Sequence, residues 1–268
     1  MRFTLPAAIA FTLFSTLTAE SHEFWISPER YQIDSTDQMI AALRVGSDFK
    51  GASYAYLPPK ITRFEIVRGG AAAPVEGRIG DRPALNIPAG GAGLAVIVHE
   101  TTDYIVRYDA WEVFQRFTDH KDARDVQDRH IARGLPQENF AERYRRYAKS
   151  LVAVGDGAGA DARQGLKIEI IAQANPYTDD LAQGLPVQVF YNDAPRANSQ
   201  LEVYAKTGDA AVQVTRLRSD AQGYVTVPME GGTEYLLDSV AIEPLEPSAQ
   251  GDPVWESHWA SLTFRTPD

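Results

Sequence analysis

Cysteine is absent from this sequence of 268 residues. Its absence excludes disulfide bonds, thiolate metal sites, iron–sulfur clusters, cysteine nucleophiles and the lipidated cysteine of a bacterial lipoprotein. Basic residues are also scarce, because 26 Lys and Arg stand against 36 Asp and Glu and leave a formal charge of −10. An acidic balance of this size argues against nucleic acid or an anionic membrane as a partner, since both attract clustered Lys and Arg.

The motifs of several enzyme classes are missing as well. No Gly-x-x-x-x-Gly-Lys-Ser/Thr loop and no Gly-x-Gly-x-x-Gly turn opens a helix, so the sequence predicts no nucleotide cofactor. No Gly-x-Ser-x-Gly elbow supplies a hydrolase nucleophile. The His-Glu pairs at His22 and His99 begin like a zinc-protease helix, but Ile26 and Asp103 stand where its second histidine is required. We therefore expect a protein that is not an enzyme.

The only long apolar run lies at the amino terminus. Arg2 provides a short positive region, and residues 5–17 are apolar apart from small hydroxyls, which is the length typical of a signal peptide. Ala19 and Ser21 are candidate cleavage points. An uncleaved anchor is the weaker alternative, because the run is short for a membrane span. We predict that residues 1–19 are a signal peptide and that the product is periplasmic and not embedded in the membrane.

The remainder of the sequence predicts a mainly β protein. Short apolar stretches bounded by Pro and Gly predict strands in residues 20–109 and 166–268. Residues 110–154 are charged, with aromatic residues every three or four positions, and predict a helical segment. The glycine-rich residues 155–165 predict a flexible linker. We expect two antiparallel β-sandwich-like domains with a helical insertion between them, the second an immunoglobulin- or transthyretin-like sandwich. The predicted strands are 23–26, 39–45, 61–67, 93–99, 104–108, 166–172, 187–191, 201–205, 212–217, 224–227, 234–242 and 257–264.

The five histidines are the main candidates for metal ligands. His120 and His130 lie in a run of mixed charges, which is typical of a solvated helix face. His99 ends an apolar strand and is equally well explained as a packed histidine or as a ligand. His258 lies in the last predicted strand next to Glu256, where it is either a ligand or an exposed side chain.

His22 carries the most information, because it follows the predicted cleavage site. Cleavage after Ala19 would leave Glu20, Ser21 and His22 as the first three residues. The new amine, two deprotonated amides and the imidazole would then offer four nitrogens in a plane, the geometry that Cu(II) and Ni(II) prefer. Cleavage after Ser21 would instead make His22 the amino terminus, whose amine and ring could form a copper brace with a second histidine.

Four segments resemble a known exported family. They are His22-Glu-Phe-Trp, Leu-Arg-Val-Gly-Ser-Asp-Phe at 43–49, Arg-Tyr-Ala-Lys-Ser-Leu at 146–151 and Trp-Glu-Ser-His-Trp-Ala-Ser-Leu-Thr-Phe at 255–264. Over the whole mature chain they are similar to a family of domains of unknown function that is commonly assigned to nickel or cobalt uptake in the periplasm. The resemblance implies a metal ion as ligand and a membrane transporter or outer-membrane receptor as partner. The family commonly has Leu-Glu-Pro where residues 26–28 read Ile-Ser-Pro, so a carboxylate is lost there.

A second resemblance covers part of the carboxy-terminal half. Residues 185–191 alternate in polarity, and an Asp-x-x-Gly sequence follows at Asp220 to Gly223. This order is similar to carboxypeptidase-regulatory-like and transthyretin-like sandwiches, in which such a turn leads from one strand to the next. Asp and Gly suit the turn, because both accept conformations that other residues avoid.

Three functions remain open on the sequence. The leading hypothesis is a periplasmic protein that binds or delivers a divalent transition metal, nickel or cobalt or else copper, with His22 as anchor and His258, His99 and Glu256 as secondary ligands. A last strand beside the first would bring His258 or Glu256 near His22. The second hypothesis is a structural sandwich that docks a transporter or receptor through an edge strand or loops. The third is a histidine-brace copper enzyme, which requires cleavage directly before His22.

Overall fold

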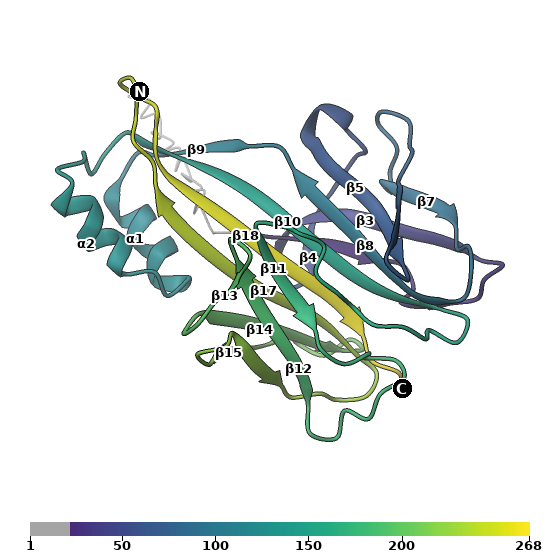
Figure 1. The fold of residues 1–268 in the computed structure, drawn as a ribbon. Helices are drawn as coiled ribbons and strands as arrows, with labels where there is room; N and C mark the ends of the chain where they lie inside the picture. The colour runs from purple at the N-terminus through teal and green to yellow at the C-terminus, as the bar shows by residue number, and fades with distance from the viewer. Residues whose placement is uncertain (1–21) are drawn as a thin grey trace, which may run out of the picture.

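The computed structural model describes residues 22–268, and this part of the chain is mainly β, as predicted (Figure 1). The predicted signal peptide, residues 1–19, lies outside the described residues. The elements form one large sheet, two smaller sheets and two short helices.

The large sheet, called the central sheet here, joins both halves of the chain. Its strands in spatial order are β15 (Gln213–Arg218), β14 (Gln200–Thr207), β17 (Thr233–Pro244), β18 (Pro253–Arg265), β10 (Phe140–Val154), β8 (Gly93–Thr101), β5 (Ile61–Arg68) and β6 (Ala71–Pro74). Two further strands, β2 (Gln32–Ile33) and β9 (Tyr104–Tyr108), pair with β10. The pairing of β10 with β18 and with β2 is parallel, and the other pairs are antiparallel.

The smaller sheets are both antiparallel. The amino-terminal sheet contains β1 (Glu23–Pro28), β3 (Gln38–Ser47), β4 (Lys50–Tyr54) and β7 (Leu85–Pro88). The carboxy-terminal sheet contains β11 (Ile168–Ala172), β12 (Leu185–Tyr191), β13 (Ala194–Pro195) and β16 (Tyr224–Val227). A single 3₁₀ turn, η1 (Pro58–Lys60), precedes β5.

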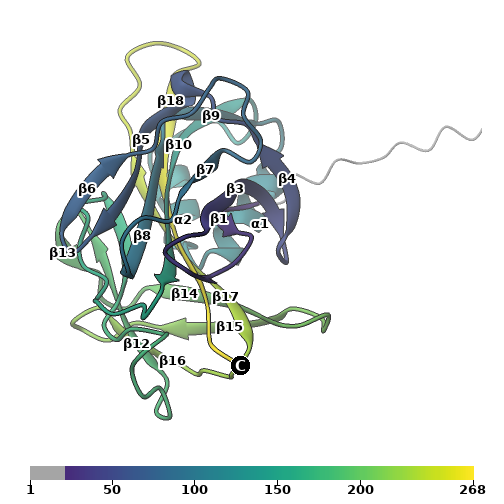
Figure 2. The ribbon, with the colours of Figure 1, turned by 90° about the vertical axis from the view of Figure 1, so that its right-hand side faces the viewer.

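The two smaller sheets cover opposite faces of the central sheet, because side chains alternate along its strands. On β8, Ala95 and Ile97 pack with the amino-terminal sheet, whereas Val96 and Val98 pack with the carboxy-terminal sheet. Figure 2 shows β1 and β4 on one side of β10 and β18, with β12 and β13 on the other. The inner strands β8, β10 and β18 are therefore buried on both faces over much of their length.

Helices α1 (Trp111–His120) and α2 (Asp125–Ala132) lie on the same face of the central sheet as the amino-terminal sheet. They cover the end of that face that the amino-terminal sheet does not reach (Figure 1). Phe114 and Phe117 of α1 pack with Trp255 and Trp259 of β18. Within residues 22–268, no helix is long and apolar enough to cross a membrane.

The prediction of helix over residues 140–154 is wrong, since this stretch forms β10. Its aromatic residues recur at helical spacing, but in the strand Tyr144 faces the cavity described below whereas Tyr147 and Leu151 join the core on the opposite face. A strand covered on both faces need not alternate between apolar and polar residues. The central sheet also continues across the predicted domain boundary, because β10 lies between β8 and β18.

Residues 155–165 have no regular secondary structure, but they are anchored. The carboxylate of Asp161 is buried and lies 2.8 Å from Nζ of Lys149 on β10. The Asp-x-x-Gly turn is confirmed, because the backbone N–H of Gly223 donates to the carbonyl of Asp220 and Gly223 has a φ of 80°. This turn connects the central sheet to the carboxy-terminal sheet.

Candidate functional site

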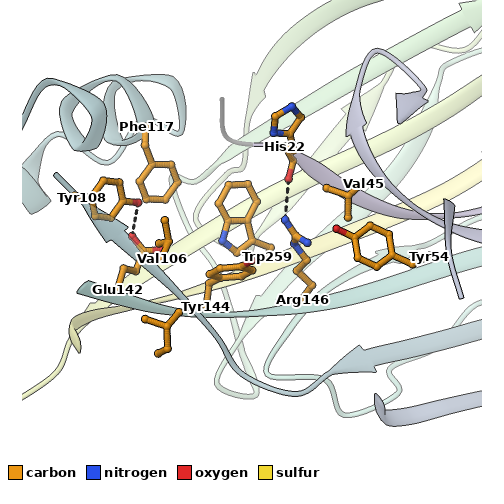
Figure 3. Close-up of a pocket in the computed structure, with 11 residues that line it drawn as sticks. His22, Val45, Tyr54, Val106, Tyr108, Phe117, Glu142, Tyr144, Arg146 and Trp259 are labelled. Carbon is orange, nitrogen blue, oxygen red and sulfur yellow. Dashed lines mark hydrogen bonds between the residues drawn. The ribbon is translucent and has the colours of Figure 1, made fainter. Parts of the chain in front are cut away.

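A cavity of about 340 Å³ lies over the central sheet, between the amino-terminal sheet and α1 (Figure 3). Alternation along β10 points Glu142, Tyr144 and Arg146 into it. Aromatic side chains from β4, β9, α1, β10 and β18 form much of the wall, namely Tyr54, Tyr108, Phe117, Tyr144 and Trp259. The cavity is thus an apolar chamber with few charged groups, as ligand sites commonly are.

His22 lies at this cavity and is the first described residue. Its carbonyl oxygen accepts a hydrogen bond of 3.3 Å from Nη2 of Arg146. Its half-buried ring points away from Trp259 and Arg146 in Figure 3. The backbone is therefore fixed at the cavity, whereas the imidazole takes no part in the contact with Arg146.

Arg146 is held mainly by aromatic rings. The centre of its guanidinium lies 5.0 Å from the ring centre of Tyr144 and 5.7 Å from that of Phe24. Its Nε is buried and has no hydrogen-bond partner among the described residues. Such a group retains an unused donor.

Glu142 is the carboxylate in the cavity wall, and it is fully buried. The hydroxyl of Tyr108 donates to its Oε2 at 2.8 Å, and the hydroxyl of Ser257 donates to its Oε1. Burial raises the pKa of Glu142 to about 7, although both hydroxyl bonds act in the opposite direction. The carboxyl is therefore partly protonated near neutral pH.

Replacing Glu142 with Gln should make the free energy of unfolding depend less on pH between about pH 5 and pH 8. The folded state holds a proton on Glu142 up to a pKa of about 7, whereas the unfolded state releases it near its usual value. The folded state binds more protons in this interval, so its stability falls as pH rises. The wild type should lose about 2 kcal/mol relative to the Glu142→Gln variant between about pH 5 and pH 8, measured by urea unfolding. Parallel pH curves for the two proteins would contradict the assignment.

A buried ion cluster lies behind the cavity. Nζ of Lys121, directly after α1, is 3.1 Å from Glu23, 2.5 Å from Glu202 and 2.9 Å from Asp238. It also lies 5.0 Å from the ring centre of Trp259, which separates it from the chamber. This Lys121 cluster ties α1 to β1, β14 and β17.

The structure brings two of the predicted metal ligands together and adds a third group. Nε2 of His258 lies 3.7 Å from Oε2 of Glu256 and 3.2 Å from Oε1 of Glu243. These three side chains could hold an ion, because their ligand atoms all lie within 4.8 Å of one another. Lys167 and Arg143 already neutralise the two carboxylates, however. A metal ion could therefore bind to this group only if these cations moved away from the carboxylates.

The expected approach of His258 to His22 is wrong. The first strand does pack on the last, since the hydroxyl of Thr263 donates to the carbonyl of Ile26 at 2.7 Å. However, Trp259 faces the cavity with His22, so its neighbour His258 points to the opposite face of the sheet. There its ring lies 5.9 Å from that of Tyr191.

His99 joins neither group. Its ring is buried between Phe24 and Phe64, with ring centres 5.2 and 5.0 Å away. Both ring nitrogens lack a hydrogen-bond partner within residues 22–268. Burial lowers its pKa to about 3, so the ring is neutral at ordinary pH.

The two helical histidines differ from each other. His130 is fully buried, which makes the prediction of a solvated face wrong for it. The indole N–H of Trp255 donates to its Nδ1 at 2.9 Å, and its Nε2 lies 2.9 Å from the carbonyl of Pro136. His120 is exposed at one edge and lies 3.1 Å from Glu202, in a second group of possible metal ligands with Glu23. Lys121 already fills that group.

Sequence reasoning did not identify Glu142, Arg146 or Lys121. Residues 142–146 read Glu-Arg-Tyr-Arg-Arg, without an alternation of polar and apolar residues, so the sequence did not indicate a strand there. Lys121 gave no indication, because its partners are 81 to 117 residues away in the sequence.

Comparison with known proteins adds a family to these observations. None of the curated proteins matches the chain. Two solved structures each match over 91% of this chain. The D0-D1 domain of Intimin has 13% identity and a TM-score of 0.24, and the match covers 98% of its chain. A tetra-tandem repeat in the extending region of a large adhesion protein has 11% identity and a TM-score of 0.21, and the match covers 49% of its chain. We base no inference on likenesses at these TM-scores. The model of a domain of unknown function, DUF4198, matches residues 19–243, and the chain therefore belongs to the DUF4198 family.

Proposed function

We propose that this chain is an exported protein that binds a divalent transition metal through its mature amino terminus, with nickel, cobalt or copper as the ion. The observation that carries the proposal is the position of His22, whose backbone is fixed at the cavity by Arg146 while its imidazole points outward. A chelate made of the terminal amine, two amides and His22 needs no second side chain. It therefore does not depend on the other four histidines, which lie in other parts of the described structure.

Titration of the mature protein beginning at Glu20 tests this proposal. Ni(II) and Cu(II) should each bind with one ion per chain and produce the absorption of a square-planar complex. His22→Ala should abolish both, because it removes the imidazole. A matched control inserts one serine between Ser21 and His22, which keeps every side chain but moves the imidazole out of the third position. That insertion should weaken binding by at least about a hundredfold, the equivalent of roughly 3 kcal/mol.

The result for His22→Ala decides between the candidate sites. Undiminished binding in that variant would overturn the chelate. If binding were then lost in a Glu256→Gln or His258→Gln variant, the ion would lie at the Glu243–Glu256–His258 group instead. Intact mass of the exported protein comes first, because a terminus at His22 would leave the brace geometry in place of the chelate.

An interaction module is the second candidate, and the edge of the central sheet favours it. Among residues 22–268, strand β15 pairs only with β14, and five of its six residues are exposed. An uncovered edge of this kind can accept a strand from a partner. We would prefer this function, with docking to a membrane transporter or receptor, if the wild type bound Ni(II) and Cu(II) no better than His22→Ala.

A further inference from the structure

The guanidinium of Arg146 stands apart from the other arginines of β10. Arg143 and Arg145 point to the opposite face, where Nε of Arg143 lies 2.9 Å from Glu256 and Arg145 lies 2.6 Å from Asp103. Arg146 faces the cavity, and no ion pair joins it to a carboxylate within the described part of the chain. Its contacts are a carbonyl oxygen and two aromatic rings.

An unpaired cation beside an apolar chamber is costly to maintain unless something compensates it. The Nε–H is already removed from water without an acceptor, and one Nη2 hydrogen goes to the carbonyl of His22. Figure 3 shows the Tyr54 hydroxyl pointing toward the same guanidinium. Together these groups offer several donors around one point of the wall, the arrangement that a planar carboxylate accepts with two oxygens.

The rest of the wall determines the body of the ligand. The rings of Phe117 and Trp259 stack at 5.5 Å with an angle of 11° between their planes. Tyr144 also lines the wall, and its ring is supported by Tyr104, outside the lining, which stacks on it at 5.3 Å with an angle of 14°. Flat apolar surfaces of this kind favour a planar partner. A chamber of about 340 Å³ leaves room for one or two rings.

Both oxygens of the Glu142 carboxyl, which lines the same chamber, are already engaged. Two hydroxyl groups, from Tyr108 and Ser257, donate to its oxygens and hold it against the wall. A cationic ligand would instead meet the positive charge of Arg146 without a free carboxylate to pair with.

We infer that the cavity is a binding site for a small organic carboxylate with a planar apolar body, in which Arg146 holds the carboxylate and the aromatic wall holds the rings. This site uses groups other than those of the metal chelate, because the His22 imidazole points away from Arg146 and Trp259. A single guanidinium among apolar walls suits a monoanion better than a sulfate or phosphate dianion.

Benzoate and naphthoate, each paired with its neutral alcohol, test the inference on the wild-type protein. With EDTA present and at about pH 6, calorimetry should give at least one carboxylate a Kd below about 1 mM, with binding at least about tenfold tighter than the matching alcohol. Tryptophan fluorescence should change on binding, because Trp259 lines the chamber. Failure of both carboxylates to bind, or equal binding of acids and alcohols, would overturn the inference.

Two arginine variants locate the site. Arg146→Gln should weaken carboxylate binding by at least about tenfold while leaving the alcohol unaffected. Arg107→Gln on β9 removes the same charge from an exposed position and should change neither. Unchanged carboxylate binding in Arg146→Gln would place the anion elsewhere. Because EDTA removes metal ions, this outcome is independent of whether the His22 chelate exists.

Discussion

Replacing Lys121 with methionine is expected to lower the free energy of unfolding by about 3–5 kcal/mol at about pH 8. The side chain is buried, and its ammonium contacts the carboxylates of Glu23, Glu202 and Asp238. Burial alone would disfavour its charge, but these three carboxylates raise the pKa of Lys121 above its ordinary value. Without the cation, three acidic groups would remain buried together.

The pH dependence of this loss identifies its cause. Burial, together with the neighbouring carboxylates, raises the pKa of Asp238 to about 6, although Lys121 acts in the opposite direction. At about pH 5 its carboxyl can accept a proton, so the loss in Lys121→Met should be smaller there than at about pH 8. Urea unfolding at the two pH values measures the difference.

Lys50→Met is the matched control. Lys50 lies exposed on β4, and the same substitution there should change the free energy of unfolding by less than about 0.5 kcal/mol. If both variants unfolded at the same urea concentration, the buried ion cluster would contribute nothing to the fold.

His99→Phe should make the protein more resistant to acid. Burial lowers the pKa of His99 to about 3, whereas the unfolded chain takes up this proton near its usual value of 6.5. Below pH 6.5 the unfolded state therefore binds more protons at this position, and the wild type becomes less stable as the pH decreases. Phenylalanine cannot take up a proton, and it preserves ring contacts with Phe24 and Phe64.

The measurement is the difference in unfolding free energy between wild type and variant along a pH series. From about pH 7 to about pH 4 this difference should move in favour of His99→Phe by about 3 kcal/mol. Other groups that titrate in this interval are common to both proteins and cancel. His99→Leu separates the effect of packing from that of titration. Relative to His99→Phe, it should change the unfolding free energy by a constant amount at every pH, while its difference from wild type should vary with pH as it does for His99→Phe. A constant difference in both variants would refute a neutral buried histidine.

Strands were the most predictable part of the fold. Residues 104–108 and 224–227 form strands with the predicted bounds, since alternation and turn residues agree there. The error at 140–154 has a physical source. Lys149 on β10 is buried and pairs with Asp161 and Glu169, so a polar residue occupies a core position that a single-sequence pattern assigns to the surface.

The candidate site was less predictable than the fold. The sequence indicated His22 through its distance from the cleavage site, which is local information. The cavity around it draws on β4, β9, α1, β10 and β18, and only the packing of these elements shows that Arg146 and Trp259 share one chamber. His130 shows the same limit, because its acceptor role toward Trp255 joins residues 125 positions apart.

The position of β18 has a consequence for the order in which the molecule assembles. This strand, Pro253–Arg265, follows the other strands of the central sheet in the sequence, yet it lies between β17 and β10 and packs against β1. Until it arrives, the halves of the large sheet have no shared neighbour, and contacts of such long sequence separation form slowly. The two parts of the central sheet can therefore join only after β18 has been made and has inserted between β17 and β10.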